Sequence, residues 1–496
     1  MNVRLDTPLG HPFLSTPKGH FIDGRMSAPE GASELFETFN PATGKVLARL
    51  AEGTASDVDR AVAAARTAFE GEWSRWSPLQ RQQLLIRIHD VMEANFEELA
   101  LLETLDMGAP LSRTRSLKPA ILQTILYFSS QTMNVGGQTL PNSLRPGITT
   151  MVLKAPIGVV GGIIPWNGPL ISQWWILGPA LATGCTAVIK PAEDASLTVL
   201  RTAELLAEAG VPPGVVNIVT GHGATTGAAV AAHPGIDRIA FTGSTETGKR
   251  IVEASAVNMK RLQLELGGKS PDIVFADADL DAAVPGAAMA VFNNSGQICF
   301  AGTRLFVERK IQDEFVARIA DFGKTLRVGN GLDADVQLGP LISARQLDRV
   351  LGYMEIAGQE GAELVSGGAR IGGALAEGYF VEPTIFANVS NDMRIAQEEI
   401  FGPVISVIPF DEPEEVLAMA NEIDYGLGGA VWTRDLGKAM KMVHGIRTGT
   451  LWVNCYGLID PGVGFGGVKM SGYGQKGGPS HVDAYLYQKC VYLNAG

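Results

Sequence analysis

The chain has 496 residues, of which 46% are hydrophobic and 19% charged, and its 52 Asp and Glu against 40 Lys and Arg give a formal charge of −12. This composition is typical of a folded protein of roughly three domain-sized units and excludes a mainly disordered chain. The acidic balance argues against binding to nucleic acid or to an anionic membrane, because both need a basic surface. The four cysteines show no paired spacing, which excludes a disulfide scaffold or a CxxC metal site and predicts a cytoplasmic location.

No targeting or membrane segment is evident. The first 20 residues are broken by Pro and Gly and read as a loose arm without the apolar core of a secretory signal. The longest apolar stretches, IGVVGGIIPW and AILQTILYF, are about half the length that a bilayer requires. We therefore expect a protein that does not cross a membrane.

The first half of the chain predicts helices followed by alternating strands and helices. Apolar residues at spacings of three and four predict amphipathic helices over 56–71 and 78–108. Short β-rich runs follow at 157–166, 185–192, 215–221 and 237–244, and helical patterns separate them at 170–184, 196–210, 223–235 and 244–256. Such alternation predicts right-handed βαβ units and a parallel sheet with helices on both faces.

A second α/β unit starts near Leu264 and runs to about Pro479. It opens with a strand over 270–280, a helix over 280–299, a strand over 303–310 and a helix over 311–326. Two extended segments fit neither unit: 137–156 reads as a hairpin, and 484–494 alternates like an edge strand. Because a long exposed edge is an aggregation hazard unless something pairs with it, these segments predict a subunit interface.

Cys299, in NNSGQICFAGTR, is the first candidate for chemistry. An arbitrary cysteine is more often buried than reactive. Here, however, polar and flexible residues interrupt a helical apolar stretch just before the thiol, which suggests that the sulfur is presented at a turn. A thiolate nucleophile needs a lowered pKa or a nearby base, and none of the seven histidines is close in sequence. Cys185 opens an apolar strand and is expected in the core.

Other candidates stand at strand ends. Glu265, in LELGGKSP, has leucine neighbours, so burial could raise its pKa toward that of a general base. FTGSTETGK places a turn between a strand and a helix, where free N–H groups suit a pyrophosphate, although this is neither GxGxxG nor a P-loop. Asn167 could donate to an oxyanion or be a turn residue, and Lys190 and Glu193 could bind a ribose or be solvated charges.

Together these segments resemble the aldehyde dehydrogenase superfamily from about residue 20 to the C-terminus. The motifs are PWNGPL, KPAE, FTGSTETGK, LELGGKSP, GQICFAGTR, EEIFGPV and FGGVKMSGYG, in the family's order and roughly its spacing. The resemblance implies two doubly wound parallel-sheet (Rossmann-like) domains plus a small β oligomerisation element. It places an NAD-binding domain at 1–138 and 156–264, a catalytic domain at 265–479, and oligomerisation segments at 139–155 and 480–496.

The resemblance also implies a mechanism and a set of site residues. Cys299 matches the nucleophile that forms a thiohemiacetal and then a thioester, Asn167 the oxyanion donor, and Glu265 the base that activates water. The positions implied for the cofactor are Lys190, Glu193, Gly243, Ser244, Gly248, Glu399, Phe401 and Trp166. No metal site is implied, and Glu193 favours NAD over NADP because a carboxylate accepts from ribose hydroxyls and repels a 2′-phosphate.

The chain departs from the family pattern at two places. The family commonly follows SGxG with Arg-Glu, whereas this chain has Gln475 and Lys476, which leaves deacylation to Glu265. Many members carry a bulky aromatic residue where this chain has Gly168, so the substrate tunnel should be wider. With apolar Trp175, Ile298 and Phe300 beside it, the tunnel predicts a medium or bulky hydrophobic aldehyde, including aromatic ones. The Trp174–Trp175 pair could equally be core packing.

The leading hypothesis is therefore a hydrolytic, NAD-dependent aldehyde dehydrogenase that acts on a small-molecule aldehyde. One alternative is a member that passes the thioester to coenzyme A, and another is a structural or binding homologue without catalysis. Glu265 and its LELGGK segment argue against the first alternative, and the retained Cys299, Glu265 and Asn167 argue against the second. The family is usually dimeric or tetrameric, so a homodimer or homotetramer is expected.

Overall fold

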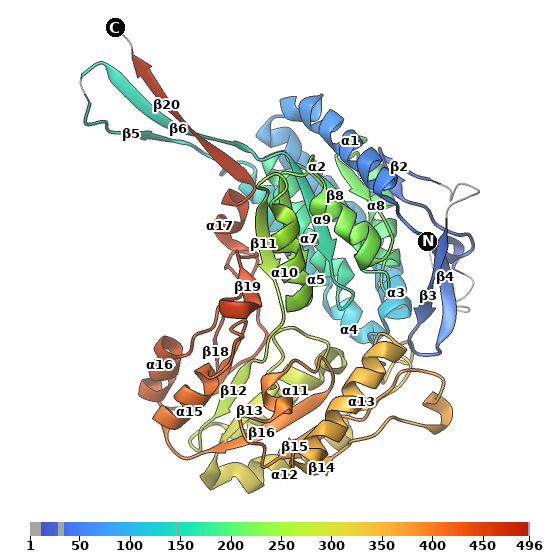
Figure 1. Cartoon of the computed structure of the whole chain (residues 1–496), viewed down its shortest axis with the longest axis vertical. Coiled ribbons are helices and arrows are strands. Elements are labelled where there is room, and N and C mark those ends of the chain that lie inside the picture. The colour runs from blue at the N-terminus through green and yellow to red at the C-terminus, as the bar shows by residue number, and fades with distance from the viewer. Residues whose placement is uncertain (1–10, 28–33, 145, 495–496) are drawn as a thin grey trace.

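The computed structural model describes residues 11–27, 34–144 and 146–494. Residues 1–10 of the predicted loose arm and the last two residues of the predicted C-terminal segment lie outside this range. The described chain contains two large sheets flanked by helices, a three-stranded sheet that projects from the body, and a two-stranded sheet of β3 and β4 (Figure 1). Among the described residues, no helix combines the length and the apolar character needed to cross a bilayer.

The first large sheet has the strand order β19-β11-β10-β7-β8-β9-β1-β2, and its five strands from β11 to β9 are parallel. Its strands are β1 (Phe21–Ile22), β2 (Arg25–Met26), β7 (Val159–Ile164), β8 (Thr186–Pro191), β9 (Val216–Ile218), β10 (Arg238–Thr242), β11 (Arg261–Glu265) and β19 (Gly472–Tyr473). The short strand β19 belongs to this sheet, although the predicted boundary assigns its residues to the second domain.

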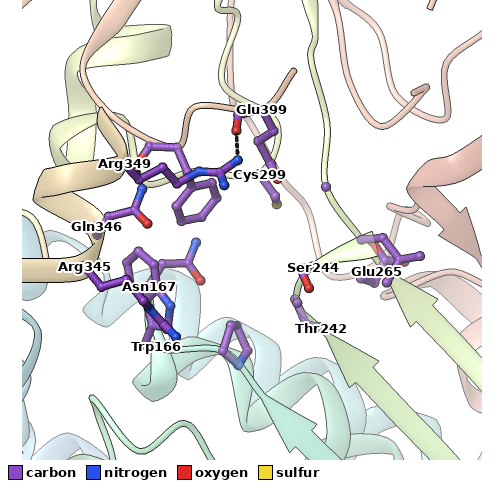
Figure 2. Close-up of a pocket in the computed structure, with 15 residues that line it drawn as sticks. Trp166, Asn167, Thr242, Ser244, Glu265, Cys299, Arg345, Gln346, Arg349 and Glu399 are labelled. Carbon is purple, nitrogen blue, oxygen red and sulfur yellow. Dashed lines mark hydrogen bonds between the residues drawn. The ribbon is translucent and has the colours of Figure 1, made fainter. Parts of the chain in front are cut away.

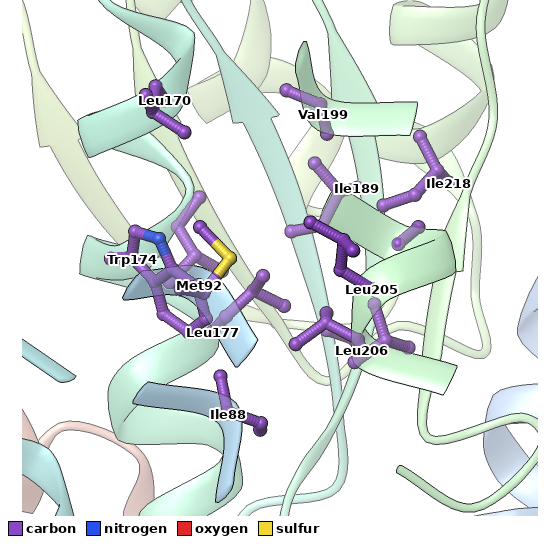
Figure 3. Packing of buried hydrophobic residues seen from close by; sticks show 14 of the residues in the cluster. Ile88, Met92, Leu170, Trp174, Leu177, Ile189, Val199, Leu205, Leu206 and Ile218 are labelled. Atoms are coloured by element: carbon purple, nitrogen blue, oxygen red, sulfur yellow. The ribbon is translucent and has the colours of Figure 1, made fainter. Parts of the chain in front are cut away.

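Neighbouring residues on the central strands pack on opposite faces of this sheet. Val188 packs with α1 (Ala55–Glu70), α9 (Ala228–Ala232) and α10 (Thr245–Ser255), whereas Ile189 packs into the core on the other face. That core is shown in Figure 3. Its helices are α2 (Pro78–Ala94), α3 (Phe96–Met107), α5 (Lys118–Gln131), α7 (Trp174–Thr183) and α8 (Leu197–Glu208). The central strands are buried on both sides, as a doubly wound parallel sheet requires.

The second large sheet is also covered by helices on both faces, and its strand order is β14-β15-β16-β13-β12-β17-β18. Its strands are β12 (Pro271–Val274), β13 (Arg304–Glu308), β14 (Glu363–Ser366), β15 (Thr384–Ala387), β16 (Val404–Phe410), β17 (Ala430–Trp432) and β18 (Trp452–Val453). One face packs against α11 (Leu280–Phe292) and α12 (Gln312–Thr325). The other packs against α13 (Ala344–Gln359), α14 (Arg394–Gln397), α15 (Pro413–Asn421) and α16 (Leu436–Gly445). The predicted α/β class with two doubly wound sheets is confirmed.

The two extended segments form the third sheet, in the order β20-β6-β5. Strand β6 (Ile148–Pro156) lies between β5 (Gln138–Leu140) and β20 (Leu486–Asn494), and both pairings are antiparallel. This sheet extends away from the two large sheets (Figure 1). The remaining named elements are β3 (Leu35–Asn40), β4 (Lys45–Ala51), α4 (Leu111–Ser116), α6 (Pro169–Ser172), α17 (Gly478–Asp483), η2 (Pro12–Leu14), η3 (Trp73–Arg75), η4 (Gly223–Gly227), η5 (Asn293–Gly296), η6 (Arg309–Ile311), η7 (Gly373–Leu375) and η8 (Lys469–Ser471).

Local sequence explains where several helices begin and end. Helix α1 begins at a capping box in which Thr54 and Asp57 satisfy each other's backbone N–H groups. Helix α7 ends at Gly184, whose φ of 89° is left-handed. The predicted helix over 78–108 is two helices, because Asn95 separates α2 from α3. The predicted helix over 280–299 ends at Phe292, where the polar residues begin.

A matched pair of glycine substitutions tests the packing of α7 on α5. A Cβ at Gly178 would lie 2.2 Å from Phe128, whereas a Cβ at Gly352 of α13 meets nothing within 4 Å. We expect Gly178→Ala to lower the free energy of unfolding by about 1–3 kcal/mol through overpacking. Gly352→Ala should instead raise it by up to about 1 kcal/mol, because alanine is the better helix former. Urea unfolding of both variants measures the difference, and equal effects would contradict the packing.

Candidate active site

Cys299 follows an irregular turn at the end of helix α11. Asn294 and Ser295 both have a φ of 54°, and the next residue, Gly296, has a φ of 74°. The Ser295 Oγ donates to the Gly339 carbonyl at 2.7 Å, and the Gln297 Oε1 accepts from the Ile342 N–H at 2.9 Å. These contacts hold the turn, as expected from the polar interruption in the sequence, and leave the Cys299 side chain half-buried.

Cys299 lies where two cavities meet, each of about 480 Å³. The first cavity reaches the turn after β10 and is drawn in Figure 2. The second lies between α4, α5, α7, α11 and the loop after β18. The residues that line both are Pro165, Asn167, Thr242 and Cys299. A molecule in either cavity can therefore reach the same sulfur atom.

Glu265 ends β11 and faces the first cavity. Strand pairing sets its backbone opposite Thr242 on one side and Gly472 on the other. Glu265 is 2% exposed, and neither carboxylate oxygen accepts a hydrogen bond from the residues that the structure describes. Burial raises the pKa of Glu265 to about 8, although the positive charge of Lys476 lowers it. A carboxylate with this pKa and two unengaged oxygens is suited to accept a proton from water.

The surroundings of Cys299 also shift the pKa of its thiol. Burial raises the pKa of Cys299 to about 12. The charge of Lys476 opposes this rise, whereas the carboxylates of Glu399 and Glu265 add to it. Lys476 is thus the only side chain among these that favours the thiolate, the form that attacks carbon.

Two asparagine amides contact the segment that leads to Cys299. The Asn167 Nδ2 donates to the Gln297 carbonyl at 2.9 Å, and the Asn294 Nδ2 donates to the carbonyls of Asn167 and Gln297 at 3.1 and 3.2 Å. Because an amide nitrogen carries two hydrogens, Asn167 keeps one donor after binding Gln297. The sequence singled out Asn167; Asn294 lay within the recognised helix break but was given no role of its own.

The first cavity also contains features suited to a dinucleotide. Gly243 and Ser244 line it, and the Ser244 Oγ caps α10 by accepting from the Thr247 N–H. Helix N-termini attract phosphate through their free N–H groups. Gly248 lies on the buried side of α10, where a Cβ would come within 2.6 Å of Leu266. Arg345, Gln346 and Arg349 of α13 also line the cavity, although the sequence gave no sign of them.

Glu399 and Phe401 line the same cavity. The Glu399 Oε1 accepts from the Gly268 N–H at 3.1 Å, and burial raises the pKa of Glu399 to about 7. Phe401 has a φ of 61° and packs edge-on against Trp166 with ring centroids 5.2 Å apart. The Glu399 carbonyl accepts a hydrogen bond from Arg349, drawn in Figure 2. These contacts hold the segment 399–401 over the cavity.

Lys190 and Glu193 form an ion pair at 2.8 Å but line neither cavity. Burial raises the pKa of Glu193, but the charge of Lys190, its hydrogen bond and hydrogen bonds from the backbone of Glu193 and Gly223 together bring that pKa below its usual value. Lys190 lies beside η4, since a Cβ at Gly227 would be 3.9 Å from its Cδ. The pair therefore lies outside the lining of the first cavity, which includes Ser244.

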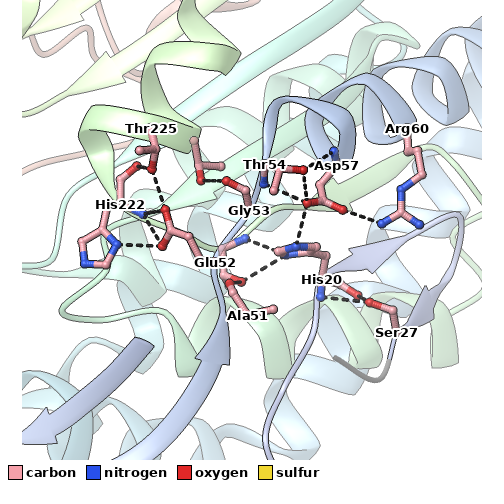
Figure 4. A network of polar contacts seen from close by, with 12 residues as sticks. His20, Ser27, Ala51, Glu52, Gly53, Thr54, Asp57, Arg60, His222 and Thr225 are labelled. Carbon is pink, nitrogen blue, oxygen red and sulfur yellow. Dashed lines mark hydrogen bonds and ion pairs between the residues drawn. The ribbon is translucent and has the colours of Figure 1, made fainter. Parts of the chain in front are cut away.

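The turn that contains η4 is fixed by Glu52. Its carboxylate accepts from the His222 backbone N–H at 3.1 Å and from the Thr225 hydroxyl at 2.5 Å, and its Oε2 lies 2.7 Å from the His222 Nδ1 (Figure 4). These hydrogen bonds lower the pKa of Glu52 although burial raises it. Glu52 thus holds the turn that lies beside Lys190.

The second cavity has mostly apolar walls. The expected residues Gly168, Trp175, Ile298 and Phe300 all line it, whereas Trp174 is fully buried in the first core. The tryptophan pair is thus divided between cavity and core. Arg113 and Lys476 are the charged residues of this lining, and neither was assigned a place in the cavity from the sequence.

Comparisons with known proteins agree with the chemistry of this site. The family model described as the aldehyde dehydrogenase family matches residues 28–491. The chain belongs to the aldehyde dehydrogenase family. It is similar to the mitochondrial aldehyde dehydrogenase of Homo sapiens, with 46% identity over 463 residues, 92% of this chain and 88% of that protein. It is also similar to betaine aldehyde dehydrogenase of Bacillus subtilis (strain 168), with 42% identity over 476 residues, 96% of this chain and 97% of that protein.

Solved structures agree with this assignment. The NAD+ complex of aldehyde dehydrogenase from Bacillus cereus matches with a TM-score of 0.96 and 42% identity, and the match covers 100% of both chains. The prediction of an aldehyde dehydrogenase that oxidises its substrate with reduction of NAD is confirmed. In this aldehyde dehydrogenase the roles of individual residues and the choice of aldehyde stay predictions. Among the described residues, no group of three or more His, Cys, Asp or Glu could hold a metal ion.

Proposed function

We propose that this enzyme oxidises its aldehyde through a covalent bond to Cys299. The observation that carries the proposal is the position of Cys299 on the walls of both cavities. The thiolate sulfur bonds the aldehyde carbon and gives a thiohemiacetal oxyanion. The free N–H of Asn167 Nδ2 and the backbone N–H of Cys299 donate to that oxygen. Covalent capture divides a difficult oxidation into hydride loss and acyl hydrolysis.

NAD, when bound, supplies the acceptor for the hydride that leaves the captured carbon. Loss of that hydride collapses the oxyanion to a thioester on Cys299. Glu265 then takes a proton from a water molecule, whose oxygen attacks the thioester carbon. The carboxylic acid is released and the sulfur is freed for the next cycle. The unengaged oxygens of Glu265 and its pKa of about 8 support this role.

We further propose which residues hold NAD. The cap of α10 at Ser244, the arginines of α13 and the carboxylate of Glu399 give the first cavity donors for phosphate and an acceptor for ribose hydroxyls. The residues proposed for the cofactor are Lys190, Glu193, Gly243, Ser244, Gly248, Glu399, Phe401 and Trp166. Lys190 and Glu193 would hold the outlying ribose, which accounts for their place beyond the lining of the first cavity.

Glu193 supports a preference for NAD over NADP. Its pKa lies below the ordinary value, so it is ionised at neutral pH. An ionised carboxylate accepts from ribose hydroxyls and repels a 2′-phosphate. Lys190 neutralises part of this charge at 2.8 Å.

The second cavity supports a medium or bulky hydrophobic aldehyde, including an aromatic one. Trp175, Ile298 and Phe300 give it apolar walls, and Gly168 leaves open the space beside Asn167. Phe300 also contacts Trp452 and Phe465, with ring centroids 5.5 and 5.6 Å apart. An apolar cavity of this kind binds apolar substrates more tightly than small polar ones.

Substitution of the reacting residues tests the mechanism. We expect Cys299→Ala to form no NADH from aldehyde while it still binds NAD, measured by absorbance and by calorimetry. Asn167→Ala should lower kcat about 100-fold, because one oxyanion donor contributes ~3 kcal/mol. Cys490→Ala, at the exposed cysteine of β20, is the matched control and should retain normal turnover. Near-normal turnover in Cys299→Ala would remove this residue from the mechanism.

A panel of aldehydes assayed with NAD and with NADP tests both preferences. The panel contains short aliphatic, long aliphatic, semialdehyde and aromatic aldehydes. We expect the largest kcat/KM with the long aliphatic or aromatic members, and a larger kcat/KM with NAD than with NADP. Glu193→Gln should narrow the difference between the kcat/KM values measured with NAD and with NADP. Equal kcat/KM for the two cofactors, or a preference for the short aldehydes, would contradict the corresponding proposal.

We also propose that residues 1–138 and 156–264 form the NAD-binding domain, 265–479 the catalytic domain, and 139–155 with 480–496 the oligomerisation segments. The third sheet supports the last part, because β5 and most of β20 are exposed and β5 offers an unpaired edge. Analytical ultracentrifugation should give a homodimer or homotetramer, and deletion of residues 486–496 should weaken it. A stable, active monomer would contradict this assignment. A cytoplasmic location stays a prediction from the cysteine usage.

A further inference from the structure

Lys476 is held beside the end of β11 by backbone pairing. Tyr473 and Gly472 pair with Leu264 and Glu265, and three residues later Lys476 exchanges two backbone hydrogen bonds of 2.7 Å with Phe465. The segment therefore runs alongside Glu265 and turns its next residues toward the second cavity. This backbone arrangement fixes where the side chain of Lys476 starts.

The side chain of Lys476 extends into the reacting region. Its Nζ donates to the Thr242 hydroxyl at 2.8 Å, and both residues line the second cavity together with Cys299. Glu265 accepts no hydrogen bond from Lys476 or any other described residue, so the charge of Lys476 acts on it through space. The ammonium group is thus anchored by a neutral hydroxyl close to two groups that must each become an anion.

Most of the other charged groups that act on the Cys299 thiol are negative, unlike Lys476. Glu399 and Glu265 both disfavour the Cys299 thiolate, and Tyr456 is the further titratable group that faces the sulfur. Arg349 faces Glu399 rather than the thiol. Arg113, the second cation of the cavity lining, faces Glu103, and its Nε donates to Asn293 at 3.1 Å.

We propose that Lys476 is a positioning residue whose positive charge, held by Thr242, stabilises the Cys299 thiolate and the Glu265 carboxylate. This role rests on the proposed function, since it acts through the nucleophile and the base named there. The family commonly has a carboxylate at this position, which would oppose both ionisations, and this chain departs from that pattern. A cation reverses that effect, because a nearby opposite charge favours the charged form.

The charge can be separated from the hydrogen bond by substitution. Lys476→Gln keeps a donor for Thr242 but removes the charge, Lys476→Met removes both, and Lys476→Arg keeps the charge. Lys324→Met, at an exposed lysine of α12 paired with Asp321, is the matched control. The melting temperature of each variant establishes that it is folded, and either neutral variant suffices for the test.

Alkylation of Cys299 by iodoacetamide provides the first readout, followed at pH 8 by mass spectrometry of the Cys299 peptide. We expect Lys476→Gln and Lys476→Met to react about tenfold more slowly than the natural chain, as a pKa rise of about one unit requires. Lys476→Arg and Lys324→Met should react at nearly the natural rate. Unchanged alkylation in a folded neutral variant, or equal slowing in Lys476→Arg, would overturn the proposal.

Hydrolysis of p-nitrophenyl acetate provides the second readout, because it acylates the thiol and needs water activation without NAD. We expect the acidic limb of its pH–rate profile to move up by about one pH unit in the neutral variants, since loss of a positive charge raises both pKa values. An unmoved limb would overturn the proposal. Neither readout requires NADH formation. An absence of NADH with the natural chain would therefore count against the proposed function, whereas unchanged alkylation would count against Lys476.

Discussion

The turn after α11 is the constraint on which the active site depends. Three successive residues, Asn294, Ser295 and Gly296, adopt left-handed backbone conformations, and two of them carry side chains. Such conformations cost about 1–3 kcal/mol each for residues other than glycine, so the surrounding structure must hold them. Side-chain hydrogen bonds from Ser295 and Asn294 do so, and a Cβ at Gly296 would come within 2.0 Å of the Gly402 carbonyl. The chain can therefore end a helix and immediately turn Cys299 toward open space.

The two large sheets give that turn its partners. β7, β10 and β11 of the first sheet end at the site and supply Asn167, Thr242 and Glu265, while α11 of the second unit leads to the sulfur. Ligands of open α/β sheets bind at the carboxyl ends of the strands. Because Asn167 and Cys299 come from different units, the hydrogen bond from Asn167 to Gln297 ties the oxyanion donor to the loop of the nucleophile. The oxyanion donor and the nucleophile are thus positioned by the same contact.

Much of this arrangement could be predicted from the sequence, and the remainder depends on contacts across long stretches of chain. The alternation of apolar strands and helices predicted both doubly wound sheets, and polar residues predicted the break before Cys299. The sequence could not assign Trp174 to the core and Trp175 to the cavity, because both lie on one apolar helix. It also could not place Lys476 opposite Thr242, since 234 residues separate them and β19 is only two residues long. The helix predicted over 78–108 is divided at Asn95, which caps the end of α2 and the start of α3. The spacing of apolar residues does not register such a break at a single position.

The central claim is that one sulfur serves both cavities and carries the acyl group between oxidation and hydrolysis. The most direct measurement is the mass of the enzyme in which hydrolysis is blocked. The Glu265→Gln variant is mixed with NAD and an aldehyde, quenched with acid and mapped by peptide mass spectrometry. The account predicts one acyl group on the Cys299 peptide, formed together with one NADH per active site. NADH formed without any adduct on Cys299, or an adduct on another residue, would contradict it.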